Sequence, residues 1–493
     1  MLEELKTFFK HTSVYGMAEF LKKGIGFIMI PVYTRYLLPA DYGLLELLDL
    51  TLNVAGMLVG FRIGAAIIRY YYHFDDPKDR DEVFTTALIF AAIVSFLGLA
   101  ALIVFSHPIS ELMAGSNQYA KYFQIIFVCL AIQTIYLVSE NYLLAQKKSI
   151  LYSCLSIGNL ILALSLNILF LVVFKMGVWA VVLSMLITKS LNGIVVVAIT
   201  LKGVRLTLSW QKLKMMIKYG MPLVPAAFSM FLIHFSDRFF VQRYCDLYEL
   251  GLYSLGYKFG MILSVLVSAP IFRIWNTQRF EIAKQDDAKM VFKRIFTYYS
   301  AIIVFAGLGL TVFIDDAIRL LASSPYHGAS AVVPLIVLSY VLYGMASFFS
   351  LGIMLTYKTK YVAYIQMTVA GLNILLNVLF ISHFGIMGAA FSTFLSFLCL
   401  AGLTLFFSQK AYFIPFEYAR VLILLALSGG IFAVSHWMDL PFVLSVGIKG
   451  LLMALFPVAL FMVKFFREEE IEEGKQLLRD VASHFRILRA ESF

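Results

Sequence analysis

The sequence predicts an all-α polytopic membrane protein with about fourteen transmembrane helices, in two parallel six-helix lobes followed by two extra C-terminal helices. Composition is the first reason, because 61% of the 493 residues are hydrophobic, only 14% are charged and the mean hydropathy is +0.85. Soluble domains carry about 25% charged residues. Long apolar segments and an internal repeat are the other two reasons. The segments are too long and continuous for the strands of a transmembrane barrel.

Fourteen apolar segments are each long enough to supply the ~20 residues that a helix needs to cross a bilayer. They cover residues 12–36, 43–68, 83–105, 119–144, 149–174, 178–201, 217–242, 250–275, 294–315, 329–356, 361–383, 386–408, 417–437 and 442–466. No cleavage site for a signal peptidase follows Lys6 and Lys10, so we expect the first helix to be retained. An even number of crossings places both termini on one side.

Positive charge is distributed unevenly between the two sides of these segments. If the N-terminus is cytoplasmic, the outward loops hold five basic residues and the inward segments hold 28 of the 40 Lys and Arg residues. The positive-inside rule therefore predicts that both termini are cytoplasmic. The same bias accounts for the net charge of +10 without a nucleic-acid partner.

The repeat and the loop lengths define the expected domains. Outward loops are short, whereas basic links and a charged tail lie on the inward side. We predict an N-terminal lobe of six helices, a cytoplasmic basic linker, a C-terminal lobe of six helices, two further helices and a cytoplasmic amphipathic tail. These parts span residues 1–201, 202–216, 217–408, 409–466 and 467–493 respectively.

A short phrase occurs twice in the chain. RYLLPADYGLLEL begins at Arg35, and RYCDLYELGLYSL begins at Arg243, 208 residues later. Segments near Ala145 and Thr356 also correspond, at an offset of 210–211 residues. Because six is even, the halves are parallel repeats, which can rock about a central cavity and give alternating access. We interpret PADYG as a tight turn between the first two helices, in which proline stops one helix and aspartate caps the next.

Ionisable side chains inside the apolar segments indicate a polar interior. The candidate cations for binding a ligand are Lys22, Lys23, Arg62, Arg238 and Lys258, and the candidates for ion coupling or charge pairing are Glu19, Asp49, His234 and Asp237. The alternative is that these groups pair with one another and lock helices together. With Glu46 included, five cations face four carboxylates, and this balance favours an anionic ligand such as a pyrophosphate.

Two stretches of the chain resemble a known family. HTSVYGMAEFLKKGIGFIMIPVYTRYLLPADYGLLELL and DRFFVQRYCDLYELGLYSLGYKFG are similar to the polysaccharide-transporter branch of the multidrug/oligosaccharidyl-lipid/polysaccharide exporter superfamily. The resemblance implies a V-shaped, MATE-like fold. It also implies a flippase for undecaprenyl-pyrophosphate-linked oligosaccharides in the bacterial cytoplasmic (inner) membrane, serving assembly of O-antigen, capsule or exopolysaccharide. By the same resemblance, Lys22 or Lys23, Arg62 and Lys258 would contact the pyrophosphate, and a glycan polymerase or chain-length protein would be a partner.

Several alternatives remain open at this level. A lipid II flippase or a cation-coupled multidrug antiporter would have the same fold, and the drive could be H⁺, Na⁺ or the membrane potential alone. A membrane polymerase or acyltransferase would need a substantial catalytic outer loop, which the segments do not provide. The chain has no phosphate-binding GxxxxGK motif and no cluster of cysteines, so we expect neither an enzyme nor a metal or other cofactor.

Overall fold

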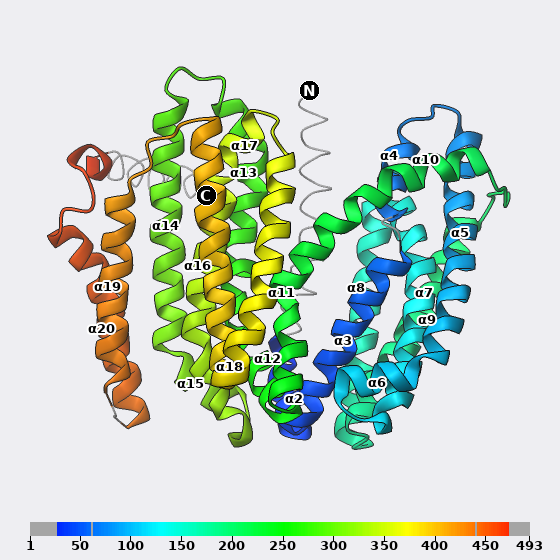
Figure 1. Ribbon diagram of the computed structural model, residues 1–493, viewed down its shortest axis with the longest axis horizontal. Helices are drawn as coiled ribbons and strands as arrows, with labels where there is room; N and C mark the ends of the chain where they lie inside the picture. Colours follow the sequence, from blue (N-terminus) through cyan, green and yellow to red (C-terminus); the bar gives the residue numbers. More distant parts are fainter. Residues whose placement is uncertain (1–26, 61–62, 439–440, 473–493) are drawn as a thin grey trace, which may run out of the picture.

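The computed structural model describes residues 27–60, 63–438 and 441–472. This part of the chain is built from helices and contains no strand. Figure 1 shows two helix bundles that meet at one end and splay apart at the other, in the form of a V. We call these the closed end and the open end. The prediction of an all-helical membrane protein with two lobes is confirmed.

The N-terminal lobe contains the helices that precede the inter-lobe link. These are α2 (Ile30–Tyr36), α3 (Pro39–Val59), α4 (Ile63–Tyr71), α5 (Pro77–Val104), α6 (Ser106–Ala114), α7 (Ala120–Ala145), α8 (Ser149–Ile168) with a π-helical turn (Leu169–Val173), and α9 (Val178–Leu201). Local sequence explains individual starts. The Asp76 carboxylate accepts a hydrogen bond from the Lys78 backbone N–H at 2.9 Å, which caps α5, and a proline occupies the first helical position.

The link between the lobes is helical and bent. It consists of α10 (Trp210–Gly220) and a 3₁₀ turn (Met221–Leu223), and it leads into α11 (Val224–Tyr244) of the C-terminal lobe through a bend of 46°. Pro222 and Pro225 lie at the bend, where the missing N–H groups interrupt the helical hydrogen bonding. The ammonium group of Lys212 holds α10 on the N-terminal lobe, because it lies 2.6 Å from Asp79 and 2.5 Å from Glu82 on α5.

The C-terminal lobe follows the same order. Its helices are α11, α12 (Leu247–Ile262) with a π-helical turn (Leu263–Ser268), α13 (Ala269–Ile282), α14 (Ala288–Val312), α15 (Ile314–Leu321), a 3₁₀ helix (Ser324–Val332), α16 (Val333–Phe349), α17 (Leu351–Leu355) and α18 (Lys360–Ala411). The element α18 folds back at Gly385, which has a φ of +55°. The Asn373 side chain therefore donates to Ser396 at 3.0 Å although 23 residues separate them.

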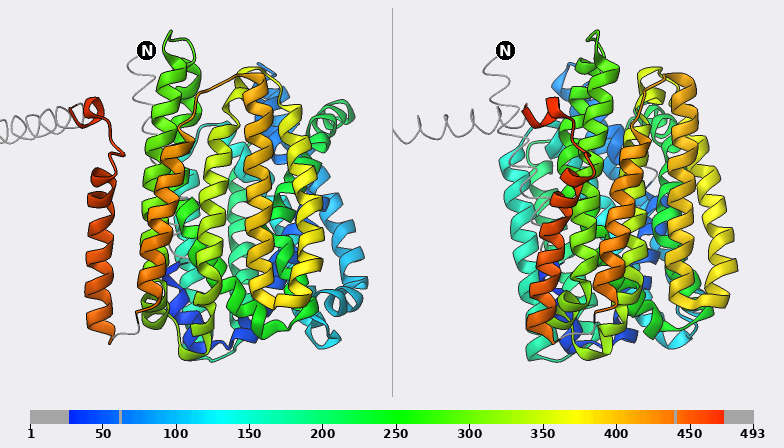
Figure 2. Two further views of the ribbon diagram at one scale, coloured as in Figure 1. Left: turned by 60° about the vertical axis from the view of Figure 1, so that its left-hand side comes forward. Right: turned by 90° about the vertical axis from the view of Figure 1, so that its left-hand side faces the viewer.

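Two more helices stand at the edge of the C-terminal lobe, α19 (Tyr418–His436) and α20 (Phe442–Met462) (Figure 2). The ammonium group of Lys449 on α20 lies 2.5 Å from the Asp316 carboxylate on α15. Directly before α19, the Glu417 carboxylate pairs with Lys293 at 3.1 Å and with Arg467 at 2.6 Å. These ion pairs fasten the start of the charged tail; residues 473–493 of the predicted amphipathic tail lie outside the described residues.

The internal repeat is visible in the backbone. Gly177 and Gly385, 208 residues apart, have φ and ψ of 57° and −135° and of 55° and −136°. Both begin a helix that returns across the lobe. Lys147 and Tyr357, 210 residues apart, both have φ between 56° and 59° at a helix end. The two halves thus share their special backbone positions as well as their order of helices.

The helices of the described residues do not all coincide with the predicted segments. Eleven helices of the described residues are long and apolar enough to cross a membrane, or twelve if the bent link counts as one. One of the eleven, α18, contains the predicted segments 361–383 and 386–408. The predicted segment 43–68 is divided between α3 and α4, and 12–36 lies mostly outside the described residues. The number fourteen therefore stays a prediction.

The basic loops lie at the open end. There the helices are joined by residues 72–76, 146–148, 202–209, 283–287 and 356–359, whereas residues 37–38, 115–119, 174–177 and 245–246 form connections at the closed end. The predicted outward residues Arg35 and Arg243 are at the closed end, in the last turns of α2 and α11. The open end is thus the one that the charge bias assigns to the cytoplasm.

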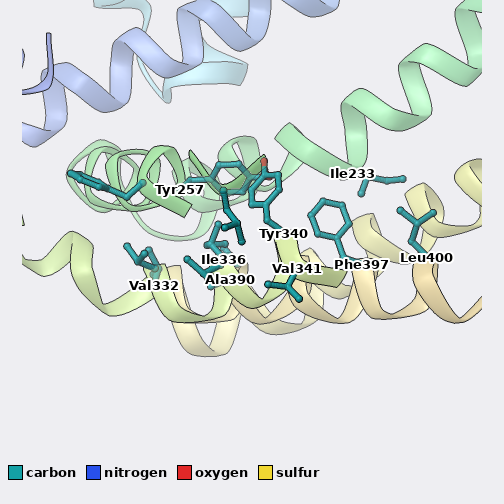
Figure 3. Packing of buried hydrophobic residues seen from close by; sticks show 14 of the residues in the cluster. Ile233, Tyr257, Val332, Ile336, Tyr340, Val341, Ala390, Phe397 and Leu400 are labelled. Atoms are coloured by element: carbon teal, nitrogen blue, oxygen red, sulfur yellow. The ribbon is translucent and has the colours of Figure 1, made fainter. Parts of the chain in front are cut away.

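A large apolar cluster fills the C-terminal lobe and reaches the meeting point of the lobes. Figure 3 shows Tyr257 of α12, Ile336 and Tyr340 of α16 and Phe397 of α18 packed side by side. All four are at most 3% exposed. Burying such side chains contributes about 1.5–3 kcal/mol each, so α12 is firmly part of this lobe. The residues that α12 presents to α3 are therefore held on a rigid support.

Candidate functional site

The duplicated phrase forms the contact between the lobes. The first copy begins α3 and the second begins α12, and these helices cross at Gly43 and Gly251. A Cβ atom on Gly43 would lie 2.1 Å from the carbonyl oxygen of Leu247, and one on Gly251 would lie 1.9 Å from that of Pro39. Only glycine permits such an approach between two backbones. The two copies therefore contact each other directly at the closed end.

This contact corrects the interpretation of PADYG as a turn. Pro39 begins α3 instead of only ending α2, and the turn itself is at Leu37 and Leu38. The capping role of Asp41 is present, because its carboxylate accepts a hydrogen bond from the Leu38 backbone N–H at 3.1 Å. Gly43 is inside the helix. The residues of PADYG, a pattern typical of a turn, thus form the first turn of α3 and its contact with the other lobe.

One turn beyond this crossing, a carboxylate of the N-terminal lobe bridges two cations of the C-terminal lobe. The Oε1 atom of Glu46 on α3 lies 2.5 Å from Nζ of Lys258 on α12. Its Oε2 atom lies 3.4 Å from Nε of Arg238 on α11. Lys258 also donates a hydrogen bond to the hydroxyl of Tyr42 at 2.7 Å. The predicted cations Arg238 and Lys258 are thus brought together, and Glu46 joins them to the other lobe.

Arg238 is held from the C-terminal side as well. Its Nη1 atom lies 3.0 Å from the Asp237 carboxylate and donates to the His234 carbonyl at 3.0 Å. Asp237 in turn accepts hydrogen bonds from Tyr253 and, at 3.4 Å, from Thr393. The Arg238 and Asp237 side chains are 3% and 1% exposed. A buried pair with this many hydrogen bonds is costly to break from one side only.

The cluster of Glu46, Asp237, Arg238 and Lys258 has no net charge. Two cations meet two carboxylates, so no positive charge is left over for an anionic ligand in this arrangement. Exposure separates the two cations, because the Lys258 side chain is 36% exposed and that of Arg238 is 3% exposed. A ligand in the open part of the V would therefore reach Lys258 first, and would reach Arg238 only if α3 moved away.

The two other described candidates have different surroundings. The ring of His234 lies among aromatic side chains, with its centre 5.0 Å from that of Tyr343 and 5.1 Å from that of Phe397. Its contribution to the cluster is its backbone carbonyl. Asp49 is one turn from Glu46 on the exposed side of α3, and its carboxylate accepts a hydrogen bond from the Asn53 amide at 3.1 Å. Lys22, Lys23, Arg62 and Glu19 lie outside the described residues, and their roles stay predictions.

Sequence reasoning did not find the role of three residues at this site. Glu46 was counted among the intramembrane carboxylates without a partner, Tyr253 was noted only as a neighbour of Lys258 on the same segment, and Tyr42 was not considered. The repeat offers one signal. Tyr42 and Glu46 belong to the first copy of the duplicated phrase, and the second copy ends just before Lys258. In two repeats related by an axis along the membrane normal, a segment that lies at the axis contacts its own copy. Pairing the two copies would have put Glu46 opposite α12.

Each lobe also contains a cavity lined by its own helices. The cavity of the N-terminal lobe measures about 520 Å³ and is lined by α3, α4 and α7, including the amide side chains of Asn53, Gln133 and Asn141. The cavity of the C-terminal lobe measures about 560 Å³ and lies among α11, α13, α16 and α18. Both have volumes in the range of ligand sites.

A family model described as polysaccharide biosynthesis protein matches residues 32–331, which is more than half of the chain. The chain belongs to this polysaccharide biosynthesis protein family. The expected place in the polysaccharide-transporter branch of the exporter superfamily is thereby confirmed. Solved structures that share its fold are described as a lipid II flippase and as multidrug resistance transporters. None of the curated proteins matches the chain in sequence.

Solved structures agree in fold with this member of the family. A structure described as lipid II flippase MurJ in an inward closed conformation has a TM-score of 0.68 and 16% identity, over 91% of this chain and 98% of that one. An inward-facing multidrug resistance MATE family transporter has a TM-score of 0.64 and 14% identity, over 84% and 96%. An outward-facing structure of a MATE family transporter gives a TM-score of 0.54 at 12% identity, over 84% and 94%.

Proposed function

We propose that this family member is a flippase that carries undecaprenyl-pyrophosphate-linked oligosaccharide from the cytoplasmic to the outer leaflet of the bacterial inner membrane. The open, basic end faces the cytoplasm under the positive-inside rule, so the V is in its inward-facing arrangement. The glycan enters between the lobes from that side, and the lipid tail stays in the bilayer. On the outer side, polymerase and chain-length proteins receive the product for a surface polysaccharide.

The observation that carries this proposal is the bridge from Glu46 to Lys258 and Arg238. It joins the lobes at the closed end and occupies two of the cations that the sequence marks for a pyrophosphate. A pyrophosphate that takes the place of the Glu46 carboxylate satisfies both cations and releases α3 from α12. Ligand binding and opening of the closed end then become one event, which is what alternating access requires.

The energetics favour outward transport of such a ligand. A pyrophosphate diester carries about two negative charges, and a membrane that is negative inside drives anions outward. If both charges cross the whole field, ~100 mV supplies roughly 4–5 kcal/mol. This drive requires no cofactor. If H⁺ or Na⁺ is coupled in addition, we propose Asp49 as the coupling carboxylate, because its side chain is exposed and its hydrogen-bond partner is the neutral amide of Asn53.

The proposal is tested by transport in proteoliposomes that contain labelled undecaprenyl-pyrophosphate oligosaccharide. Its appearance in the opposite leaflet is read out with a membrane-impermeant enzyme that oxidises exposed sugars. We expect Lys258→Met to lower the initial rate at least tenfold, because a charge-assisted contact contributes about 1.5–3 kcal/mol. Glu46→Gln keeps the shape of the side chain but removes its charge, so we expect a weakened closed end and faster exchange between the two arrangements.

Lys449→Met is the matched control, because Lys449 also forms an ion pair but lies at the edge of the C-terminal lobe. It should leave the rate per folded protein unchanged. If Lys258→Met also has no effect, the pyrophosphate does not use this cluster. Transport of lipid II in preference to the oligosaccharide lipid, or of a cationic dye in its place, would contradict the proposed substrate.

A further inference from the structure

The cavity of the C-terminal lobe contains an arginine that the charged cluster does not use. Arg279 is on the last turn of α13 and lines the cavity of about 560 Å³. The cavity lies beside the π-helical turn Leu263–Ser268, which widens the helix directly before α13. Such turns are frequent at functional sites. None of the residues that line the cavity is an aspartate or a glutamate, so the wall itself offers this cation no counter-charge.

Arg279 is partly buried in the last turn of α13 and lacks the ion-pair partners that Arg238 and Lys258 have. Its Nε atom is buried and has no hydrogen-bond acceptor, and its Cζ atom lies 4.9 Å from the centre of the Phe280 ring, a neutral partner from the same helix. Trp275, one turn earlier on α13, is 3% exposed, and its Nε1–H also lacks an acceptor.

We propose that Arg279 binds an oxyanion on the glycan, so that this cavity is a subsite for an acidic saccharide. The ligand class is a hydroxylated sugar that carries a carboxylate or a phosphate. This deepens the proposed function, since the glycan is the part of the ligand that enters between the lobes. It is separate from the Glu46 cluster, which is on α3, α11 and α12 and would hold the pyrophosphate.

The rest of the cavity wall suits a sugar. Asn276 and Gln366 present amide groups, and Ser264 and Thr404 present hydroxyls; none of these four side chains has a partner among the described residues. Phe272 and Tyr343 contribute apolar faces. A few polar groups in a largely apolar wall fix the orientation of a ligand. The planar guanidinium can hold two oxygens of a carboxylate or phosphate at once.

Binding of small soluble probes to the purified full chain in nanodiscs tests this inference without any transport. Calorimetric titration compares cellobiuronic acid with cellobiose, which differ by one carboxylate, and glucose 1-phosphate with glucose. We expect at least one acidic probe to bind at least tenfold more tightly than its neutral counterpart. In Arg279→Gln this preference should disappear. The arm that responds tells a sugar carboxylate from a sugar phosphate.

Arg273→Gln is the matched control, because Arg273 is an exposed arginine on the same helix that does not line the cavity. It should bind the acidic probe as the unaltered chain does. If Arg279→Gln does not fold, Gln366→Leu serves instead, with an expected loss of at least threefold for the same probe. Equal affinity for acidic and neutral probes, or an acid preference that survives both variants, overturns the inference. A transport defect in Lys258→Met with intact acid binding would concern the Glu46 cluster alone.

Discussion

Replacing Gly43 by alanine should drive the lobes apart at the closed end. The new Cβ atom would lie 2.1 Å from the Leu247 carbonyl oxygen, whereas the closest carbon–oxygen contacts between packed backbones are about 3.3 Å. The two helices must therefore separate by about 1.2 Å at their crossing. The obstacle is backbone on a rigid helix and cannot rotate away.

The cost of this separation follows from overpacking. Extra methyl groups in a well-packed contact cost about 1–3 kcal/mol. The contact exists only while the closed end is closed, so the cost falls on the inward-facing arrangement alone. A difference of 1–3 kcal/mol shifts the ratio of the two arrangements by about 5- to 150-fold. Gly43→Ala should thus increase the outward-open population by a factor in this range.

Distances between spin labels measure this shift. Labels at Gln118 and Ser324, in a background without the native cysteines, report the separation of the lobes at the closed end, because both are exposed and belong to different lobes. We expect a longer-distance population in Gly43→Ala. Gly158→Ala is the control, because nothing lies within 4 Å of its added Cβ atom. Identical distance distributions in the two variants would refute the idea that this crossing closes the V.

Further predictions concern the supports of the lobes, each measured as thermal stability of the purified protein. Gly385→Ala should destabilise the protein by about 1–2 kcal/mol, because alanine is strained at a φ of +55°. Gly371→Ala is the control and should be neutral or stabilising. Equal thermal unfolding midpoints for the two variants would contradict the strain at Gly385. Asp316→Asn should lower the free energy of unfolding by about 1–3 kcal/mol, because it leaves Lys449 without its charged partner. The double variant with Lys449→Met should regain most of this stability. A double variant as unstable as Asp316→Asn would mean that the two residues are not coupled. Lys212→Met should loosen α10 from α5 and increase proteolysis of the link within residues 202–209; an unchanged cleavage rate would refute its anchoring role.

The fold was largely predictable from composition, segment length and the repeat, because each is a property of the linear sequence. The ends of the helices were less predictable at places where the backbone conformation of one or two residues decides them. Gly385 allows a fold-back without any polar loop, and Pro222 and Pro225 bend a link that extends its helix back to Trp210. Hydropathy detects neither the angle of a bend nor the lobe against which a link packs.

The site was predictable only in part. Arg238, Asp237 and Lys258 were identified because a charge inside an apolar segment is expensive. Glu46, the common partner of Arg238 and Lys258, is 192 residues from Arg238 along the chain, and helical periodicity relates residues only within one helix. Arg279 was counted as a loop cation because it is near a segment end. Its position in a cavity depends on three other helices, which no local pattern in α13 reveals.

The crossing of Gly43 and Gly251 has the geometry of an isologous interface in a homodimer, although both copies are in one chain. In such an interface each contact has a mate across the axis. At the offset of 208 residues, Ser254 corresponds to Glu46 and Leu50 corresponds to Lys258, so these two residues would form the equivalent contact. Ser254 is fully buried with an unpaired hydroxyl, and Leu50 is 5% exposed. Within the described residues, the crossing is symmetric, whereas the ion pair of Glu46 and Lys258 has no charged mate across the axis.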